Sequence, residues 1–107
     1  MKISNIVKSF IALGHDTRLT IYTLLVTKGE RGIPAGEVAA ELDIPGATLS
    51  FHLASLTEAK LIGSRREGRT IYYFVKYKRV KKLIKYLKDP IAATAVETDI
   101  INEPEVE

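Results

Sequence analysis

The chain has 107 residues, of which 46% are hydrophobic and 27% are charged, and it contains no cysteine. This length and balance predict one small folded domain and argue against a disordered chain, while the lack of cysteine excludes disulfides, thiolate metal sites and cysteine nucleophiles. No apolar run approaches the ~20 residues of a membrane span, so we expect a cytoplasmic protein without membrane contact.

Basic and acidic residues are separated along the chain. Residues 1–88 carry all 16 lysines and arginines but only seven acidic residues, whereas residues 89–107 carry the other six acids and no base. We expect residues 1–88 to form the folded domain and residues 89–107 to form a flexible acidic tail, although residues 91–101 are apolar enough to dock on another surface. The excess of basic residues in residues 1–88 favours binding to a polyanionic partner. The alternative is that these charges only keep the protein in solution.

Two helices are predicted at the start of the chain. Apolar residues recur at three- and four-residue steps over residues 3–13, which is the pattern of an amphipathic helix, and Gly14 interrupts it. We expect the second helix to begin with Asp16 as its N-cap and to end at Gly29. This helix is apolar around much of its circumference, so we expect it to be central.

The next segment predicts a helix-turn-helix. Pro34 suits the first turn of a short helix that runs to about Leu42, and the Pro- and Gly-containing break at residues 43–46 separates it from a helix over about residues 47–59. Two helices joined by a turn of a few residues place the second helix where it can enter a DNA major groove.

A hairpin and a last helix complete the domain. Residues 62–66 and 69–75 predict two strands joined by a two-residue turn at Glu67-Gly68, and the last helix ends before Pro90. The order α-α-α-α-β-β-α, mainly α with a small β-hairpin, is that of a winged helix-turn-helix.

The fourth helix has an unusual polar face. Its leucines can face a core, but the other side carries short hydroxyls, an aromatic and a histidine where Lys and Glu are usual: Thr48, Ser50, Phe51, His52 and Ser55. Short donors and acceptors allow close approach to base edges, and an aromatic ring can pack on a thymine methyl group. We therefore expect this face to contact DNA, with packing of Phe51 and His52 against the wing or a partner subunit as the alternative.

Three arginines lie near the expected hairpin tip. Arg65, Arg66 and Arg69 fall within five residues, and such a cluster suits phosphates or the narrow minor groove. Ordinary exposed surface residues are the alternative interpretation.

The first and last helices carry stripes of apolar residues that the core of so small a domain does not fully bury. We expect them to pair across a two-fold axis as a homodimer, placing two recognition helices about one DNA turn, roughly 34 Å, apart. Packing within one subunit is the alternative. The expected interface residues are Ile3, Ile6, Val7, Phe10, Val80, Leu83, Ile84 and Leu87.

The sequence offers few residues suited to metal binding or catalysis. The two histidines, His15 and His52, fall in different elements, and no nucleophile, paired acids or phosphate-cradling glycine loop is evident. We expect no metal, no cofactor and no enzymatic activity.

Three motifs in order resemble the ArsR/SmtB family of transcriptional regulators. They are "ALGHDTRLTIYTLL", "TLSFHLASLTEAKLI" and "SRREGRTIYYFV", and the similarity spans roughly residues 10–87. The resemblance implies a homodimer formed by the first and last helices, often a repressor that leaves its operator when an inducer binds. It implicates in DNA binding Ala47, Thr48, Ser50, Phe51 and His52 of the recognition helix and Arg65, Arg66 and Arg69 of the wing.

The chain departs from that family in two places. Pro45-Gly46 replaces the polar pair that opens many recognition helices, so the operator sequence cannot be carried over. The cysteines of arsenite, cadmium, lead and persulfide sensors are missing, and the last helix offers only Asp89 to zinc or nickel.

We expect a dimeric, sequence-specific regulator of double-stranded operator DNA, a repressor without the usual metal-sensing sites and with an unknown inducer. The alternative is a protein-interaction module that uses Phe51, Tyr72 and Tyr73 as a patch. A third hypothesis has the acidic tail fold over the basic face as a mimic of DNA.

Overall fold

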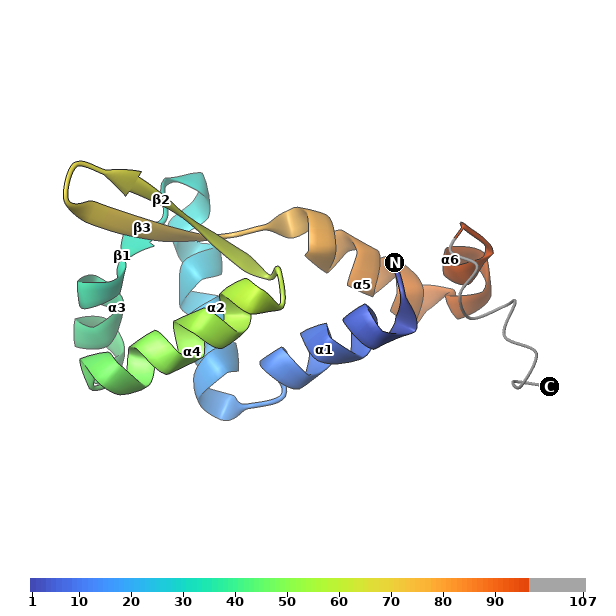
Figure 1. The fold of residues 1–107 in the computed structure, drawn as a ribbon, viewed down its shortest axis with the longest axis horizontal. Helices are drawn as coiled ribbons and strands as arrows, with labels where there is room; N and C mark the ends of the chain where they lie inside the picture. The colour runs from blue at the N-terminus through green and yellow to red at the C-terminus, as the bar shows by residue number, and fades with distance from the viewer. Residues whose placement is uncertain (97–107) are drawn as a thin grey trace.

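The protein forms a helical body with a three-stranded sheet at one end and two helices at the other (Figure 1). The structure is a computed structural model, and it describes residues 1–96. The elements in chain order are α1 (Ile3–Leu13), α2 (Asp16–Lys28), η1 (Gly29–Arg31, a 3₁₀ turn), β1 (Ile33–Pro34), α3 (Ala35–Leu42), α4 (Gly46–Glu58), β2 (Ile62–Glu67), β3 (Thr70–Val75), α5 (Tyr77–Lys88) and α6 (Pro90–Val96). The winged helix-turn-helix expected from the sequence is confirmed.

The start of α2 differs from the prediction by one residue. His15, not Asp16, is the N-cap, and its Nδ1 atom accepts a hydrogen bond from the backbone N–H of Thr17 at 3.2 Å. Asp16 is instead the first helical residue, where its negative charge is favourable beside the positive end of the helix dipole. The predicted end is confirmed, because Gly29 follows the helix with a φ of +64° that favours glycine.

The turn between α3 and α4 contains Asp43 in a left-handed conformation, with φ of 55° and ψ of 50°. Asp is one of the few side chains that tolerate this conformation, which ends α3 and redirects the chain. Pro45 then precedes α4, and the first turn of α4 contains neither a side-chain cap nor an acidic residue. The first amide groups of this helix therefore have no side-chain cap.

The hairpin turn lies one residue later than expected. Glu67 pairs with Thr70, so the two turn residues are Gly68 and Arg69, not Glu67 and Gly68. Gly68 has a φ of +64°, as expected of a glycine in a tight turn, and it occupies the first central position, where a type II′ turn requires glycine. Arg69 is therefore carried at the tip itself.

A third strand, β1, pairs antiparallel with β3 and was not predicted. Ile33 lies opposite Tyr73 and Pro34 opposite Tyr72, which gives the sheet order β1-β3-β2. The approach depends on Gly32, whose φ is +78°: a Cβ atom here would lie 2.5 Å from the carbonyl oxygen of Tyr73. Only glycine allows the two backbones to come this close.

The core lies between α2, α4 and the inner face of the sheet. The predicted inward leucines of α4 are buried, and they pack with residues of the central helix α2 and with Ile62, the first residue of β2. The largest fully buried hydrophobic side chains are Ile21, Leu25, Val38, Leu49, Leu56, Leu61 and Ile62.

Arg79 joins α5 to the rest of the domain. Its Nη1 atom donates to the Oγ atom of Ser9 in α1 at 3.2 Å and to the carbonyl oxygen of Ala59, just after α4, at 3.3 Å. Ser9 is fully buried and also donates to the carbonyl oxygen of Asn5 at 3.0 Å. One guanidinium group thus ties together three elements that lie far apart in the sequence.

The first part of the expected tail is helical, which corrects the prediction of an irregular segment. Asp89 accepts a hydrogen bond on Oδ1 from the backbone N–H of Ala92 at 3.1 Å, and Pro90 occupies the first position of α6. This is the usual geometry of an Asp N-cap followed by proline. The remainder of the predicted tail, residues 97–107, lies outside the described residues. Among the helices of residues 1–96, none has the length and apolar character needed to cross a membrane.

Candidate nucleic-acid interface

The N-terminus of α4 and the turn between β2 and β3 lie at the same end of the molecule, away from α1 and α5 (Figure 1). The short turn at Asp43 sets the direction of α4, and antiparallel pairing of β2 with β3 extends the hairpin. The start of α4 and the hairpin turn with its arginines are thus placed together, although they are separated in sequence.

The open face of α4 is largely where the sequence predicts it. Ala47, Thr48, Ser50 and Phe51 are exposed, and the ring of Phe51 is 62% exposed. Ser55 is only half-buried, and its Oγ atom donates to the carbonyl oxygen of Phe51 at 3.2 Å. Apart from the Phe51 ring, this face bears no long side chain before Glu58, so another surface can approach the helix closely. Contact with DNA by these residues stays a prediction.

The placement of His52 on this open face is wrong. The side chain is only 6% exposed, and its Nδ1 atom accepts a hydrogen bond from Nε of Arg18 at 3.2 Å. Its ring centroid lies 4.8 Å from that of His15. Burial lowers the pKa of His52 below its ordinary value, and the nearby charges of His15 and Arg18 act in the same direction. The neutral ring is the form that can accept at Nδ1.

Arg18 is the residue of this region to which the sequence analysis gave no role. Besides its bond to His52, its Nη1 atom is 3.5 Å from the carbonyl oxygen of Ala12, and its guanidinium carbon lies 5.8 Å from the centre of the Phe51 ring. It therefore connects the end of α1, the start of α2 and the recognition helix. A single arginine in an otherwise uncharged stretch of α2 was the available signal.

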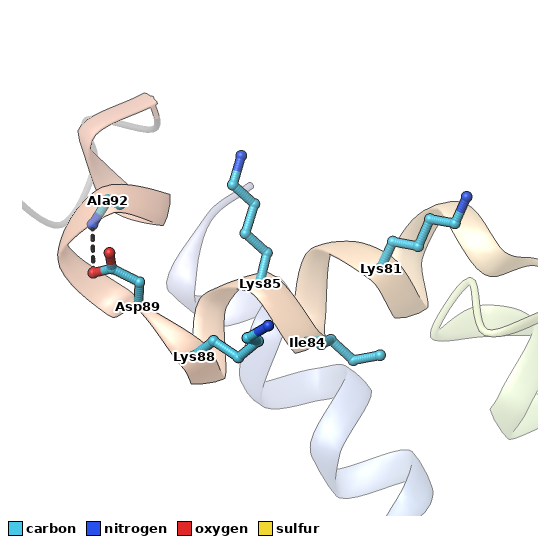
Figure 2. A pocket seen from close by; sticks show the side chains of 6 residues that line it. All are labelled: Lys81, Ile84, Lys85, Lys88, Asp89 and Ala92. Atoms are coloured by element: carbon cyan, nitrogen blue, oxygen red, sulfur yellow. Dashed lines mark hydrogen bonds between the residues drawn. The ribbon is translucent and has the colours of Figure 1, made fainter.

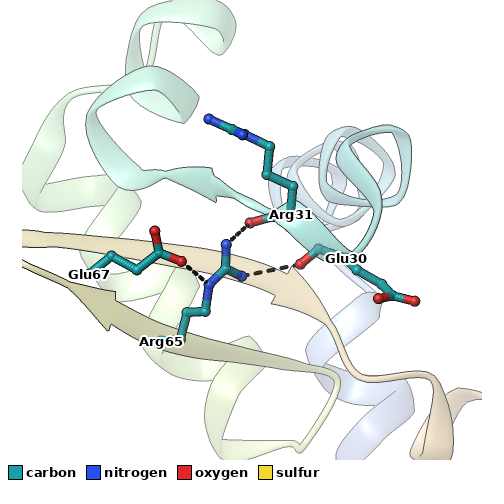
Figure 3. A network of polar contacts seen from close by, with 4 residues as sticks. All are labelled: Glu30, Arg31, Arg65 and Glu67. Atoms are coloured by element: carbon teal, nitrogen blue, oxygen red, sulfur yellow. Dashed lines mark hydrogen bonds and ion pairs between the residues drawn. The ribbon is translucent and has the colours of Figure 1, made fainter.

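Arg65 does not belong to the exposed wing tip, which corrects the second site prediction. Its Nε atom donates to Oε2 of Glu67 at 2.6 Å, and its two terminal nitrogens donate to the backbone carbonyl oxygens of Glu30 and Arg31 (Figure 3). The guanidinium carbon lies 5.0 Å from the ring centre of Tyr72. Arg65 thus fastens the wing to η1, and each of its three guanidinium nitrogens already donates to a partner within the chain.

Arg66 and Arg69 remain exposed on the wing. The side chain of Arg66 points away from that of Arg65, because neighbouring residues of a strand face opposite sides. Its Nε atom donates to the carbonyl oxygen of Gly68 at 3.1 Å, which leaves the terminal nitrogens of its guanidinium for other partners. These two residues are the basic groups that the structure keeps available beside the turn.

The aromatic patch expected for a protein partner is not formed. Tyr72 lies beneath the guanidinium group of Arg65, and Tyr73 packs against the core, so neither joins the exposed ring of Phe51. Within residues 1–96, no group of three or more His, Asp or Glu residues is arranged to hold a metal ion.

The expected dimer stripes divide into buried and exposed residues. Ile6 and Leu83 are each only 4% exposed within their own subunit, which corrects their assignment to an interface surface. Phe10 and Val80 are half-buried against the core. The residues of the two stripes that remain exposed are Ile3, Val7, Ile84 and Leu87, and Ile11, which was not predicted, is also exposed.

Comparisons with known proteins agree with this architecture. A family model described as a helix-turn-helix domain matches residues 13–65. An HTH-type transcriptional regulator of Methanocaldococcus jannaschii is 35% identical over 80 residues, which cover 75% of this chain and 88% of that protein. An ArsR-like transcriptional regulator from Rhodococcus sp. RHA1 superposes with a TM-score of 0.74 at 25% identity, covering 92% of this chain and 91% of that one.

A third relative is described as a homodimer. The winged helix-turn-helix DNA-binding domain of a possible ArsR-family transcriptional regulator from Mycobacterium bovis superposes with a TM-score of 0.67 at 25% identity, covering 89% of this chain and 84% of that fragment. The motifs, the fold and these relatives agree: the chain belongs to the ArsR/SmtB family of winged helix-turn-helix, DNA-binding transcriptional regulators.

Proposed function

We propose that the protein is a homodimeric repressor that binds double-stranded operator DNA in a sequence-specific manner. The observation that carries this proposal is the joint placement, at one end of the molecule, of the N-terminus of α4 and of the hairpin turn beside which Arg66 and Arg69 are exposed. Because a regulator of this kind works where the genome is, we place it in the cytoplasm.

The recognition helix supplies the base contacts in this proposal. Thr48 and Ser50 offer short hydroxyl groups that can donate to or accept from base edges, and the exposed ring of Phe51 can pack on a thymine methyl group. The amides at the N-terminus of α4 face the backbone phosphates, with no acidic residue in the first turn to repel them. His52 has an indirect role in this proposal, because its hydrogen bond with Arg18 of α2 holds α4, the helix that carries these residues, in position.

The wing supplies contacts to the DNA backbone. Arg66 and Arg69 can reach phosphates or the adjacent minor groove, and such contacts add affinity without reading the sequence. Two wings in a symmetric dimer would flank the two recognition helices.

The exposed apolar residues of α1 and α5 support the dimer. Val7 and Ile11 of α1 and Ile84 and Leu87 of α5 are between 47% and 66% exposed, which is unusual for four large apolar side chains in so small a domain. Pairing them with a second copy removes this surface from water, as the homodimeric relative suggests. Any inducer must bind without thiolate ligands, since the chain has no cysteine.

A salt series separates the two kinds of DNA contact. We would measure fluorescence anisotropy of full-length protein on a labelled fragment from upstream of its coding region and on a scrambled fragment. Arg66→Gln should weaken binding to both and reduce the salt slope by about two, one for each subunit of the dimer, whereas Ser50→Ala should change the preference between the fragments. Lys82→Gln on α5 removes the same charge far from the proposed interface. Equal effects of Lys82→Gln and Arg66→Gln would contradict the proposal.

A further inference from the structure

A groove with a basic rim lies where α5 meets α6. It has a volume of about 410 Å³, and its lining includes Lys81, Lys85 and Lys88 together with Ile84 and Ala92 (Figure 2). The three lysines share one side of α5 because they are four and three residues apart. Ile84 is 53% exposed and lies at the margin of this side. We call this feature the α5–α6 groove.

The lysines of the groove have no acidic partner among residues 1–96. The one acidic residue of the lining is Asp89, and its carboxylate already accepts the hydrogen bond from the N–H of Ala92 that begins α6. The ion pairs elsewhere, Lys28–Glu41 and Arg65–Glu67, involve other faces of the domain. Within residues 1–96 the groove therefore combines a net positive charge, three lysines against one aspartate, with exposed apolar surface, and it suits an acidic, partly apolar peptide.

The chain itself contains such a peptide. Residues 97–107, which follow α6 directly, contain five acidic residues and no basic residue, and Ile100 and Ile101 are adjacent apolar residues among them. Eleven residues can span up to about 36 Å, whereas the 12 residues of α5 extend over only about 18 Å. The segment is thus long enough to reach each lysine of the groove from the end of α6.

We propose that residues 97–107 dock in the α5–α6 groove of their own chain. Carboxylates of the segment pair with Lys81, Lys85 and Lys88, and the adjacent isoleucines pack on the methylene stems of these lysines and on Ala92. By neutralising these lysines, the docked segment lowers the positive field that draws any DNA to the domain, and so favours specific over non-specific binding. The docking stands by itself, whereas this effect on DNA rests on the proposed function.

Zero-length carbodiimide cross-linking of the full-length protein tests the docking, because it joins only amines and carboxylates that are in contact. Mapped by mass spectrometry, links from residues 97–107 should concentrate on Lys81, Lys85 and Lys88. Lys60, Lys76, Lys78 and Lys82 are matched controls, since they are also exposed and cluster around another hollow of the same domain.

Two outcomes of this experiment would overturn the docking. One is an even distribution of links over the groove and the control lysines. The other is a link that joins two chains in a mixture of ¹⁴N- and ¹⁵N-labelled protein, which would place the segment on a partner subunit.

The effect on DNA is measured with a second full-length variant in which all five carboxylates become amides: Glu97→Gln, Asp99→Asn, Glu103→Gln, Glu105→Gln and Glu107→Gln. It should bind a scrambled duplex severalfold more tightly than the wild type at low salt, with the difference disappearing at high salt. Equal low-salt affinities would overturn the regulatory effect while the cross-links still report docking. No DNA binding by either protein would instead refute the proposed function, and the cross-links would be unaffected.

Discussion

Replacing Arg65 by glutamine should destabilise the domain, although this arginine belongs to the motif that suggests a DNA contact. The side chain is only 35% exposed, and its guanidinium group makes two hydrogen bonds to backbone carbonyl groups, an ion pair with Glu67 and a stacking contact with Tyr72. Hydrogen bonds of charged groups contribute ~1.5–3 kcal/mol each when buried, and partial exposure reduces this to about 1 kcal/mol each. The ion pair and the stacking contact add roughly 0.5 kcal/mol each.

Glutamine can regain about one of these hydrogen bonds, so the expected net loss is about 2 kcal/mol. For a domain of this size that corresponds to a decrease in Tm of roughly 8–16 °C. Arg66→Gln is the matched control, since Arg66 is the next residue of β2 but is exposed, and it should leave Tm within about 2 °C. Thermal unfolding followed by circular dichroism measures both. An unchanged Tm for Arg65→Gln together with lost DNA binding would refute the structural role and return Arg65 to the interface.

Three further predictions concern other parts of the molecule. Lowering the pH below about 6.5 should reduce the free energy of unfolding. The pKa of His52 in the folded state is below its ordinary value of 6.5, so in this pH range the unfolded chain takes up a proton that the folded chain does not. His52→Gln should remove this part of the pH dependence of Tm. Gly32→Ala should cost more than about 2 kcal/mol in urea unfolding, because its Cβ would meet a backbone carbonyl group of β3, whereas Gly36→Ala, which has open space around it, should be neutral or stabilising. Leu87→Glu should convert the dimer to a monomer in sedimentation velocity without changing the circular dichroism spectrum, and a persistent dimer would place the interface elsewhere.

The sequence predicts most helices closely because their signals are local. The apolar repeat before Gly14 and the stop at Gly29 are read from neighbouring residues, and both agree with the structure. The strand β1 could not be predicted in this way, because two residues have no periodicity and their pairing depends on the close approach at Gly32. For α6, Pro90 was interpreted only as the end of one helix, although Asp89 before it also caps the next.

In the candidate site, too, features set by neighbouring residues could be predicted, whereas those set by distant partners could not. Exposure of Thr48, Ser50 and Phe51 follows from the turn of a helix whose leucines face inward. His52 and Arg65 were misplaced because their partners, Arg18 and the backbone of η1, are 34 and 34–35 residues away in the sequence. The spacing of Leu49, His52 and Leu56 did contain a signal, since a residue three positions after one core leucine and four before another lies on the buried face.

Sequence-specific binding can be tested by selecting DNA from a random duplex pool with the full-length protein, because the selection does not depend on where the operator lies. We expect enrichment of an inverted repeat whose two half-sites are centred about one helical turn apart, since two α4 helices in a symmetric dimer read two successive major grooves. The same selection with Ser50→Ala should change the enriched bases. A pool that stays at its starting composition after several rounds would contradict sequence-specific recognition by this fold.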